Sequence, residues 1–153
     1  MSLDNRLEYP EAALVLIGED EPDNQVILQT VVESLVGARA TVAGDGLAVL
    51  ASVERERPRM ILLDLMMPGL DGYQLVRALR GDPETAQIPL VLLTALAEDT
   101  QQFVGLASGA DQYLTKPASP QAIVATIQQV ITLTQAERAR ALQHLVEDEQ
   151  GAP

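Results

Sequence analysis

The chain has 153 residues, the size of one globular domain, and its 47% hydrophobic and 21% charged residues are ordinary for a packed protein and exclude a disordered one. Its 22 acidic residues outnumber 10 basic ones, and the net charge of −12 argues against direct binding of nucleic acid or of an anionic membrane. The absence of cysteine and the single histidine exclude disulfides, a cysteine nucleophile, and metal sites built from thiolates or several histidines.

The first predicted elements follow a polar, flexible leader at residues 1–11. The continuous apolar run Leu14–Ile17 predicts a strand buried on both faces, as in a parallel sheet covered by helices. A helix is predicted over Asn24–Val36, then a weaker strand at Thr41–Ala43 and a helix over Gly46–Glu56. The apolar residues at helical spacing, which are expected to pack, are Ile27, Leu28, Val31, Val32 and Leu35 in the first helix and Leu47, Leu50 and Val53 in the second.

The same alternation continues in the second half of the chain. Met60–Leu63 and Leu90–Leu93 are continuous apolar runs that predict buried strands, and Tyr113–Thr115 is a weaker candidate. Helices are predicted over Gly72–Arg80, over Asp99–Ser108, and from Pro120 to about Val146, with Ile123, Ile127, Val130 and Ile131 packing on the sheet. Five alternations of strand and helix indicate an α/β domain with a parallel sheet and right-handed crossovers.

We expect one folded domain over residues 12–132, followed at residues 133–153 by a helical extension and a frayed tail. Apolar residues persist in this extension among charged ones, so it is a partner-binding or dimerising helix, a linker to an output domain, or a solvated tail helix. No apolar run approaches the roughly 18 residues of a membrane span, and no signal peptide is evident. We therefore expect a cytoplasmic protein with no membrane partner.

Polar side chains follow four of the predicted strands. Glu19 and Asp20 come soon after the first, Asp64 after the third, Thr94 after the fourth and Lys116 after the fifth. Ligands of open parallel sheets bind beyond the carboxyl ends of the strands, so these five side chains are expected to converge on one edge of the sheet.

The chemistry of this group points to a metal ion and a phosphoryl group. Three carboxylates at close range need a cation to stay ionised, and oxygen ligands favour Mg2+ first, with Mn2+ or Ca2+ behind. Lys116 supplies a positive charge and Thr94 a hydroxyl donor, and both suit a phosphoryl group. Asp64, after the central strand, is the natural nucleophile, and its product would be an aspartyl phosphate.

Four segments carry a family resemblance: Val15–Pro22, Ile61–Gly72, Leu93–Ala95 and Gly109–Pro117. Together and in this order they resemble the receiver domain of two-component response regulators, the family of the chemotaxis regulator. The resemblance covers about residues 12–132. It implies a doubly wound α/β fold with five parallel strands in the order 2-1-3-4-5 and helices on both faces of the sheet.

The resemblance also implies roles for particular residues. Asp64 would take a phosphoryl group from a sensor histidine kinase or a histidine phosphotransfer protein. Asp20 would bind Mg2+ directly and Glu19 through water or as a second acidic ligand, while Asp64 and the main-chain carbonyl of Met66 would complete the metal site.

The same resemblance implies a switch and an output. Thr94 would bind the new phosphoryl group, Lys116 would pair with Asp64 and then with that group, and Tyr113 would turn inward. The face formed by the fourth helix, fifth strand and fifth helix would then change shape for an unknown downstream protein. The domain would catalyse only its own phosphorylation and dephosphorylation, with no outside substrate.

Two positions depart from the family pattern, and several alternatives stay open. Gly18 replaces a β-branched residue, which is expected to loosen the first strand end, and Ala118 replaces a common phenylalanine. Tyr113 could instead be a half-buried core residue. The rivals are a degenerate receiver that binds a partner without phosphorylation, a phosphohydrolase with an aspartate nucleophile, and a flavin-binding relative. Met66 stands where the hydrolases usually carry a second aspartate, and the oligomeric state stays open.

Overall fold

The computed structural model describes residues 13–65, 67, 72–95 and 109–132. Their centre is a five-stranded sheet in the order β2-β1-β3-β4-β5, with every neighbouring pair parallel. This confirms the predicted fold class and strand order. The strands are β1 (Leu14–Gly18), β2 (Arg39–Ala43), β3 (Met60–Asp64), β4 (Leu90–Thr94) and β5 (Gln112–Thr115).

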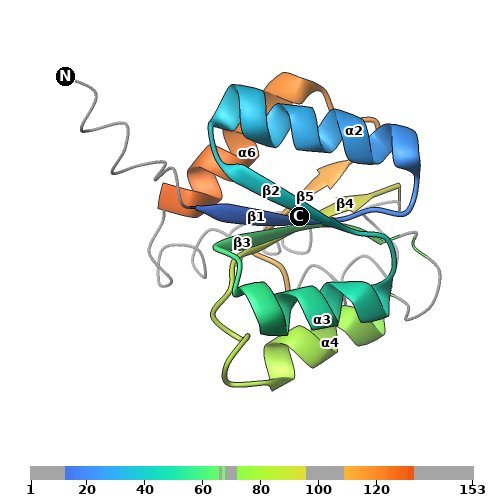
Figure 1. Ribbon diagram of the computed structural model, residues 1–153, viewed down its shortest axis with the longest axis vertical. Coiled ribbons are helices and arrows are strands. Elements are labelled where there is room, and N and C mark those ends of the chain that lie inside the picture. The colour runs from blue at the N-terminus through green and yellow to red at the C-terminus, as the bar shows by residue number, and fades with distance from the viewer. Residues whose placement is uncertain (1–12, 66, 68–71, 96–108, 133–153) are drawn as a thin grey trace, which may run out of the picture.

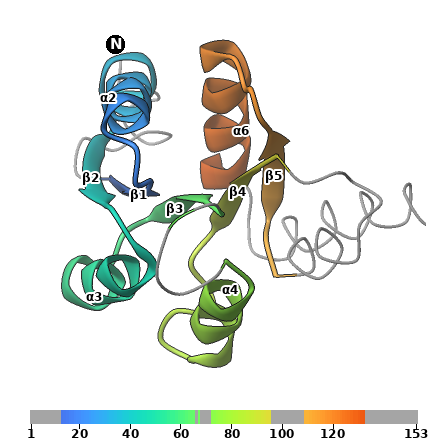
Figure 2. The ribbon, with the colours of Figure 1, turned by 90° about the vertical axis from the view of Figure 1, so that its right-hand side faces the viewer.

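Helices cover both faces of the sheet. Helices α2 and α6 lie on one face, and α3 and α4 lie on the other (Figures 1 and 2). The first helix continues into a short π-helical segment, η1, before β2. The helices are α2 (Pro22–Thr30), η1 (Val31–Val36), α3 (Gly46–Glu56), α4 (Gly72–Gly81) and α6 (Pro120–Thr132).

The core consists of two apolar layers, one on each face of the sheet. Successive residues of a strand point to opposite faces, so Val15 and Ile17 pack under α2 and α6 while Leu16 packs under α3 and α4. Every residue of β1, β3 and β4 is buried. This two-sided burial explains why the apolar runs of these strands show no alternation.

The edge strands β2 and β5 are more polar and less buried than the three central strands. Each has one strand neighbour, which leaves its outer side open. The central strands extend one residue beyond the predicted apolar runs, because the polar ends Gly18, Asp64 and Thr94 still take part in strand pairing.

The predicted packing stripe of the first helix is only partly right. Leu28, Val31 and Val32 are buried, but Ile27 is 53% exposed and Leu35 is 57% exposed. Leu35 is exposed because it lies in η1, whose π-helical turns are wider than α-helical turns. The later residues are therefore rotated about the helix axis, and Val36 is buried in place of Leu35. Ile27 lies beside the carboxyl edge of the sheet, at the mouth of a hollow described below.

The packing face of α3 is also displaced from the prediction. Leu47 is 67% exposed, whereas Gly46, Val49 and Val53, spaced i, i+3 and i+7, are buried. The prediction is therefore wrong for Leu47 and confirmed for Val53, which is buried, and for Leu50, which is partly buried and packs against the core. In α6 all four predicted packing residues are buried: Ile123, Ile127, Val130 and Ile131.

Gly18 does not loosen the end of β1. It pairs with Ala43 on one side and with Leu63 on the other. A Cβ atom at position 18 would lie 2.7 Å from Leu63 Cδ1 and 3.1 Å from Val49 Cγ2. The absence of a side chain therefore permits close packing at this strand end, and the expectation of a loose end is wrong.

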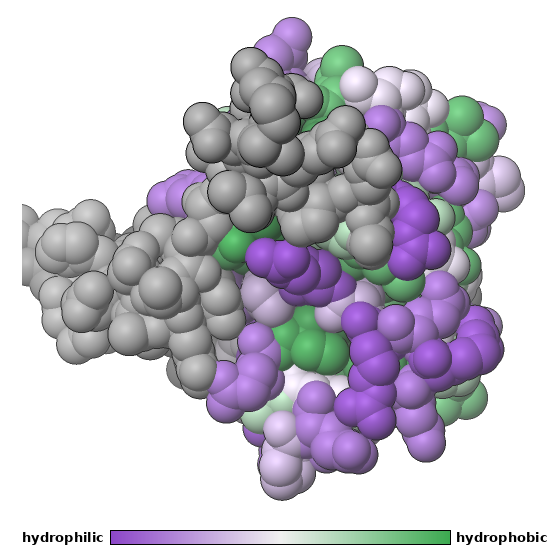
Figure 3. All heavy atoms as spheres, turned by 60° about the vertical axis from the view of Figure 1, so that its left-hand side comes forward, coloured by the Kyte–Doolittle hydropathy of each residue, from purple (hydrophilic) through white to green (hydrophobic). Residues whose placement is uncertain are grey.

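The described surface in Figure 3 is mainly hydrophilic, with small apolar areas between the polar groups. Among the helices of the described ranges, none is long and apolar enough to span a membrane. The predicted helix over Asp99–Ser108, the leader at residues 1–11 and the extension at residues 133–153 lie outside the described residues and stay predictions.

Candidate functional site

The five polar side chains predicted to converge come from the carboxyl ends of four neighbouring strands. Strand register brings these ends level: Gly18 pairs with Leu63, Asp64 with Leu93, and Thr94 with Thr115. Residues almost a hundred positions apart in the chain therefore meet at one edge of the sheet. The carboxylate oxygens of Glu19, Asp20 and Asp64 lie within 4.8 Å of one another.

Asp64 is the most constrained of the three acids. Its side chain is 2% exposed, and its Oδ2 accepts a hydrogen bond from Lys116 Nζ at 2.5 Å. Lys116, the only lysine in the sequence, is 30% exposed and so reaches solvent at its end of the pair. A buried carboxylate is costly without a partner, and Lys116 supplies a cationic partner to Asp64 at the base of the site.

Glu19 lies beside Asp64 and is 1% exposed. Burial raises the pKa of the Glu19 carboxyl to about 7. The hydrogen bond from the Glu21 N–H lowers the pKa, the hydrogen bond and like charge of Asp64 raise it, and the positive charge of Lys116 lowers it. Near neutral pH this carboxyl is therefore divided between its protonated and ionised forms, and a cation beside it would favour the ionised form.

The loop between β1 and α2 holds the first two acids in place. The Glu19 N–H donates to the Ala43 carbonyl at 3.0 Å, which ties the loop to the end of β2. The Glu19 carbonyl accepts from Gln25 Nε2 at 2.7 Å, which ties it to α2. Gln25 is a site residue that sequence reasoning missed, because nothing in its spacing separates it from other helical glutamines.

The acidic group fits a hard divalent cation. Asp20 is the least buried of the three acids and faces the approach from solvent, whereas Glu19 and Asp64 lie deeper. Three carboxylates offering oxygen at this separation match the ligands that Mg2+ prefers. Met66, whose main-chain carbonyl was predicted as a further ligand, lies outside the described residues.

The hydroxyl and the lysine are linked through the main chain. The Lys116 N–H donates to the Thr94 carbonyl at 2.8 Å, and Thr94 is 2% exposed. The Lys116–Pro117 peptide bond is cis. Tyr113 is half-buried in β5 and packs against the core layer under α3 and α4, so its position accommodates both the switch role and the core role predicted for it.

An apolar hollow of about 360 Å³ lies next to the acids. Ile27, Ala118 and Ile123 line it, and Glu19 and Lys116 form its border with the site. The small Ala118 side chain, where a phenylalanine is common in the resembled family, leaves this hollow open.

Comparison with known proteins decides the family. The family model described as the response regulator receiver domain matches residues 15–128. The chain is a receiver domain of this family. Receiver domains are signalling domains of two-component systems, so the resemblance seen in the sequence is confirmed.

Curated relatives include two groups of regulators. The chain is 38% identical over 117 residues to the probable transcriptional regulator ycf27 of Porphyridium aerugineum, covering 76% of this chain and 47% of that protein. It is 37% identical over 128 residues to the DNA-binding response regulator MtrA of Mycolicibacterium smegmatis, covering 84% and 54% respectively. The receiver domain thus spans about half the length of these relatives.

Solved structures agree. The receiver domain of sensor histidine kinase PA1611 from Pseudomonas aeruginosa, with magnesium coordinated in its active site cleft, has a TM-score of 0.72 and 33% identity, covering 80% of this chain and 99% of that one. The chemotaxis response regulator CheY4 of Vibrio cholerae has a TM-score of 0.71 and 28% identity, covering 78% and 98%.

The expectation that this protein has no nucleic-acid partner does not fit the relatives' names, since MtrA is named as DNA-binding. That expectation came from the net negative charge, which bears only on binding by the surface of this domain. A receiver domain with a net charge of −12 therefore says nothing about DNA binding elsewhere in a longer regulator.

Proposed function

We propose that this receiver domain accepts a phosphoryl group on Asp64 and thereby controls a protein contact. The observation that carries the proposal is the buried Asp64–Lys116 pair, with Nζ and Oδ2 2.5 Å apart, beside Glu19 and Asp20. A buried carboxylate with a cationic partner, next to two further acids, is suited to nucleophilic attack on phosphorus.

The phosphoryl donor would be a phosphohistidine of a sensor histidine kinase or a phosphotransfer protein. An Asp64 oxygen forms the new O–P bond as the P–N bond breaks, and the imidazole leaves with the electron pair and takes up a proton. Glu19, Asp20 and Asp64 would hold Mg2+, with Mn2+ as a substitute. When bound, that ion supplies positive charge next to the phosphoryl oxygens.

After transfer, the charge at Asp64 grows and moves outward onto the phosphoryl oxygens. Lys116, whose side chain reaches solvent, would follow that charge, and the Thr94 hydroxyl would donate to it. Because Thr94 and Lys116 share a main-chain hydrogen bond, both movements act on the ends of β4 and β5. Tyr113, in β5, would carry the change to the surface that a downstream protein contacts.

The domain would act on itself and on no outside substrate. Phosphohydrolases with an aspartate nucleophile usually carry a second aspartate two residues after it, and Met66 holds that position here. Turnover of p-nitrophenyl phosphate would favour that alternative. We also propose the boundaries 12–132 for the receiver domain, with the helical extension at residues 133–153 following it.

The experiment is intact-protein mass spectrometry after incubation with acetyl phosphate, with and without Mg2+. We expect one addition of about 80 Da that requires Mg2+ and is removed by hydroxylamine, the behaviour of an acyl phosphate. Asp64→Asn should abolish the addition, and Asp82→Asn, at the other edge of the sheet, should retain it. Unchanged phosphorylation of Asp64→Asn refutes the assignment, and no addition to the wild type favours a degenerate receiver.

A further inference from the structure

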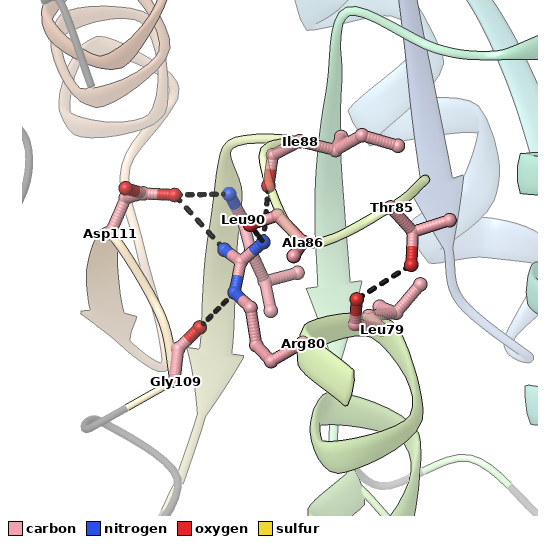
Figure 4. A network of polar contacts seen from close by, with 8 residues as sticks. All are labelled: Leu79, Arg80, Thr85, Ala86, Ile88, Leu90, Gly109 and Asp111. Carbon is pink, nitrogen blue, oxygen red and sulfur yellow. Dashed lines mark hydrogen bonds and ion pairs between the residues drawn. The ribbon is translucent and has the colours of Figure 1, made fainter. Parts of the chain in front are cut away.

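A second group of polar contacts lies near the amino end of β4, on the side of the sheet opposite the carboxyl ends of the strands, where the site lies. Arg80, near the end of α4, donates from Nε to the Gly109 carbonyl at 2.7 Å (Figure 4). Its Nη1 donates to the carbonyls of Ala86 at 3.0 Å and Ile88 at 2.6 Å. Its Nη2 donates to Asp111 Oδ2 at 3.2 Å. We call Arg80, Asp111 and these carbonyls the Arg80 cluster.

Asp111 connects this cluster to the first residue of β4. Its Oδ2 accepts from the Leu90 N–H at 2.7 Å (Figure 4). Its own N–H donates to the Leu90 carbonyl at 2.8 Å. Both main-chain polar groups of Leu90 are therefore held by one residue. The side chains of Arg80 and Asp111 are 23% and 15% exposed, so water competes little for these contacts.

The cluster lies where the alignment of β5 is decided. β5 is an edge strand, and β4 is its only strand neighbour in the described sheet. Asp111 immediately precedes β5, and Lys116 immediately follows it. The pairing of β5 with β4 is thus held by Asp111 and Leu90 at one end and by the Lys116–Thr94 hydrogen bond at the other.

We propose that Arg80 and Asp111 are positioning residues that set the register of β5 and so place Lys116 against Asp64. A shift of one residue along the strand moves a side chain by about 3.3 Å and turns it to the other face of the sheet. The Lys116–Asp64 pair, at 2.5 Å, does not survive such a shift. The role in phosphoryl transfer rests on the proposed function, but the placement of Lys116 does not.

This role predicts a selective effect. Glu19 and Asp20 follow β1, and Asp64 ends β3. Both strands are paired on two sides within the sheet, whereas Lys116 follows the edge strand β5, whose first end is held by Asp111. Loss of the cluster should therefore displace Lys116, while Glu19, Asp20 and Asp64 keep their places at the ends of β1 and β3. A general loss of stability would disturb Lys116 and the three acids alike.

The first test uses the single lysine of the chain as its own probe. The folded protein is treated with acetic anhydride, and acetylation of Lys116 is followed by peptide mass spectrometry. In Arg80→Gln we expect Lys116 to react roughly three- to tenfold faster than in the wild type, which lies within the range of coupling between residues linked through a backbone shift. The matched control is Arg77→Gln, which removes an exposed arginine from the same helix, where it lies over the Tyr73 ring.

Equal rates in Arg80→Gln and Arg77→Gln overturn the proposal, provided that circular dichroism shows both to be folded. If Arg80→Gln does not fold, Asp111→Asn replaces it, since its amide oxygen still accepts from the Leu90 N–H while the ion pair with Arg80 is lost. A faster reaction of Lys116 in Asp111→Asn then supports the proposal, and an unchanged rate overturns it.

The second test is a double-mutant cycle with Lys116→Met, read as the rate of phosphorylation by acetyl phosphate. Arg80→Gln should slow the reaction roughly three- to tenfold in the wild-type background and leave the residual rate of Lys116→Met unchanged. Equal losses in both backgrounds mean that Arg80 does not act through Lys116. A wild type that takes no phosphoryl group refutes the proposed function, and the acetylation rates still decide the role of Arg80.

Discussion

Glu19→Gln should stabilise this receiver domain at alkaline pH, because it replaces a buried ionisable carboxyl with a neutral side chain. The pKa of Glu19 rises from 4.5 to about 7 on folding, chiefly because of burial. The folded protein therefore binds this proton more tightly than the unfolded chain does. The contribution of Glu19 to stability is most favourable below pH 4.5 and is lost as the pH rises through about 7.

The size of this stability effect follows from the difference between the ordinary pKa of Glu19, 4.5, and its pKa in the fold, about 7. At 1.36 kcal/mol for each tenfold change, ionising Glu19 in the metal-free fold costs about 3 kcal/mol. Glutamine has nearly the same shape, carries no charge, and keeps an oxygen that can accept from the Glu21 N–H. We expect Glu19→Gln and the wild type to be about equally stable at pH 4.5, and Glu19→Gln to be about 3 kcal/mol more stable at pH 8.

The assay is urea unfolding followed by circular dichroism, in EDTA, between pH 4.5 and 8. Other carboxyl groups titrate in both proteins, so the difference in unfolding free energy isolates Glu19. Glu33→Gln, which removes an exposed acid from η1, is the control for the loss of one negative charge. A Glu19→Gln advantage that is the same at every pH, or a variant less stable than the wild type at pH 8, would refute the reasoning.

Four further outcomes follow from the same geometry. Lys116→Met removes the cation that pairs with the buried Asp64 carboxylate and should lower the unfolding free energy at pH 8 by about 3 kcal/mol, measured in urea. Because Mg2+ competes with the proton of Glu19, its dissociation constant by titration calorimetry should be about tenfold higher at pH 6 than at pH 8, and a constant value would contradict the role of Glu19. Saturating Mg2+ should remove the stability advantage of Glu19→Gln at pH 8, since the ion stabilises the ionised carboxyl. Gly18→Ala places a Cβ 2.7 Å from Leu63 Cδ1 and should cost about 1–3 kcal/mol in thermal or urea unfolding, where no loss would show that the strand end can expand.

The packing of the helices shows where sequence patterns stop being sufficient. α-Helical spacing placed Leu35 and Leu47 on buried faces, and both are more than half exposed. Side-chain periodicity describes a face only if the helix keeps one geometry and one rotation. The π-helical turns of η1 change the helix geometry at Leu35. The packing of α3 through Gly46 and Val49 sets the rotation of that helix, which leaves Leu47 exposed.

The candidate site shows the same division on a smaller scale. Asp64, Glu19, Asp20, Thr94 and Lys116 could be picked out as candidates, because each lies at the end of a predicted strand or just after it, and parallel strands end on the same side of a sheet. The raised pKa of Glu19 could not, since it depends on burial and on the distance to Asp64. The Gln25 contact and the Arg80 cluster could not be predicted either. Arg80 is 29 residues from Gly109 and 31 residues from Asp111 in the sequence, and no local pattern links them.

The sequence by itself determined the alternation of strands and helices, the parallel sheet and the five polar residues at its carboxyl edge. These follow from local patterns: continuous apolar runs, helical spacing and polar strand ends. The tertiary structure alone decided that the pKa of Glu19 lies near neutral pH, how closely Lys116 approaches Asp64, and which contacts hold the start of β5 against β4. Those properties depend on distances between chain segments remote in sequence, because electrostatic and hydrogen-bond energies change steeply over a few ångströms while periodicity carries no such distances.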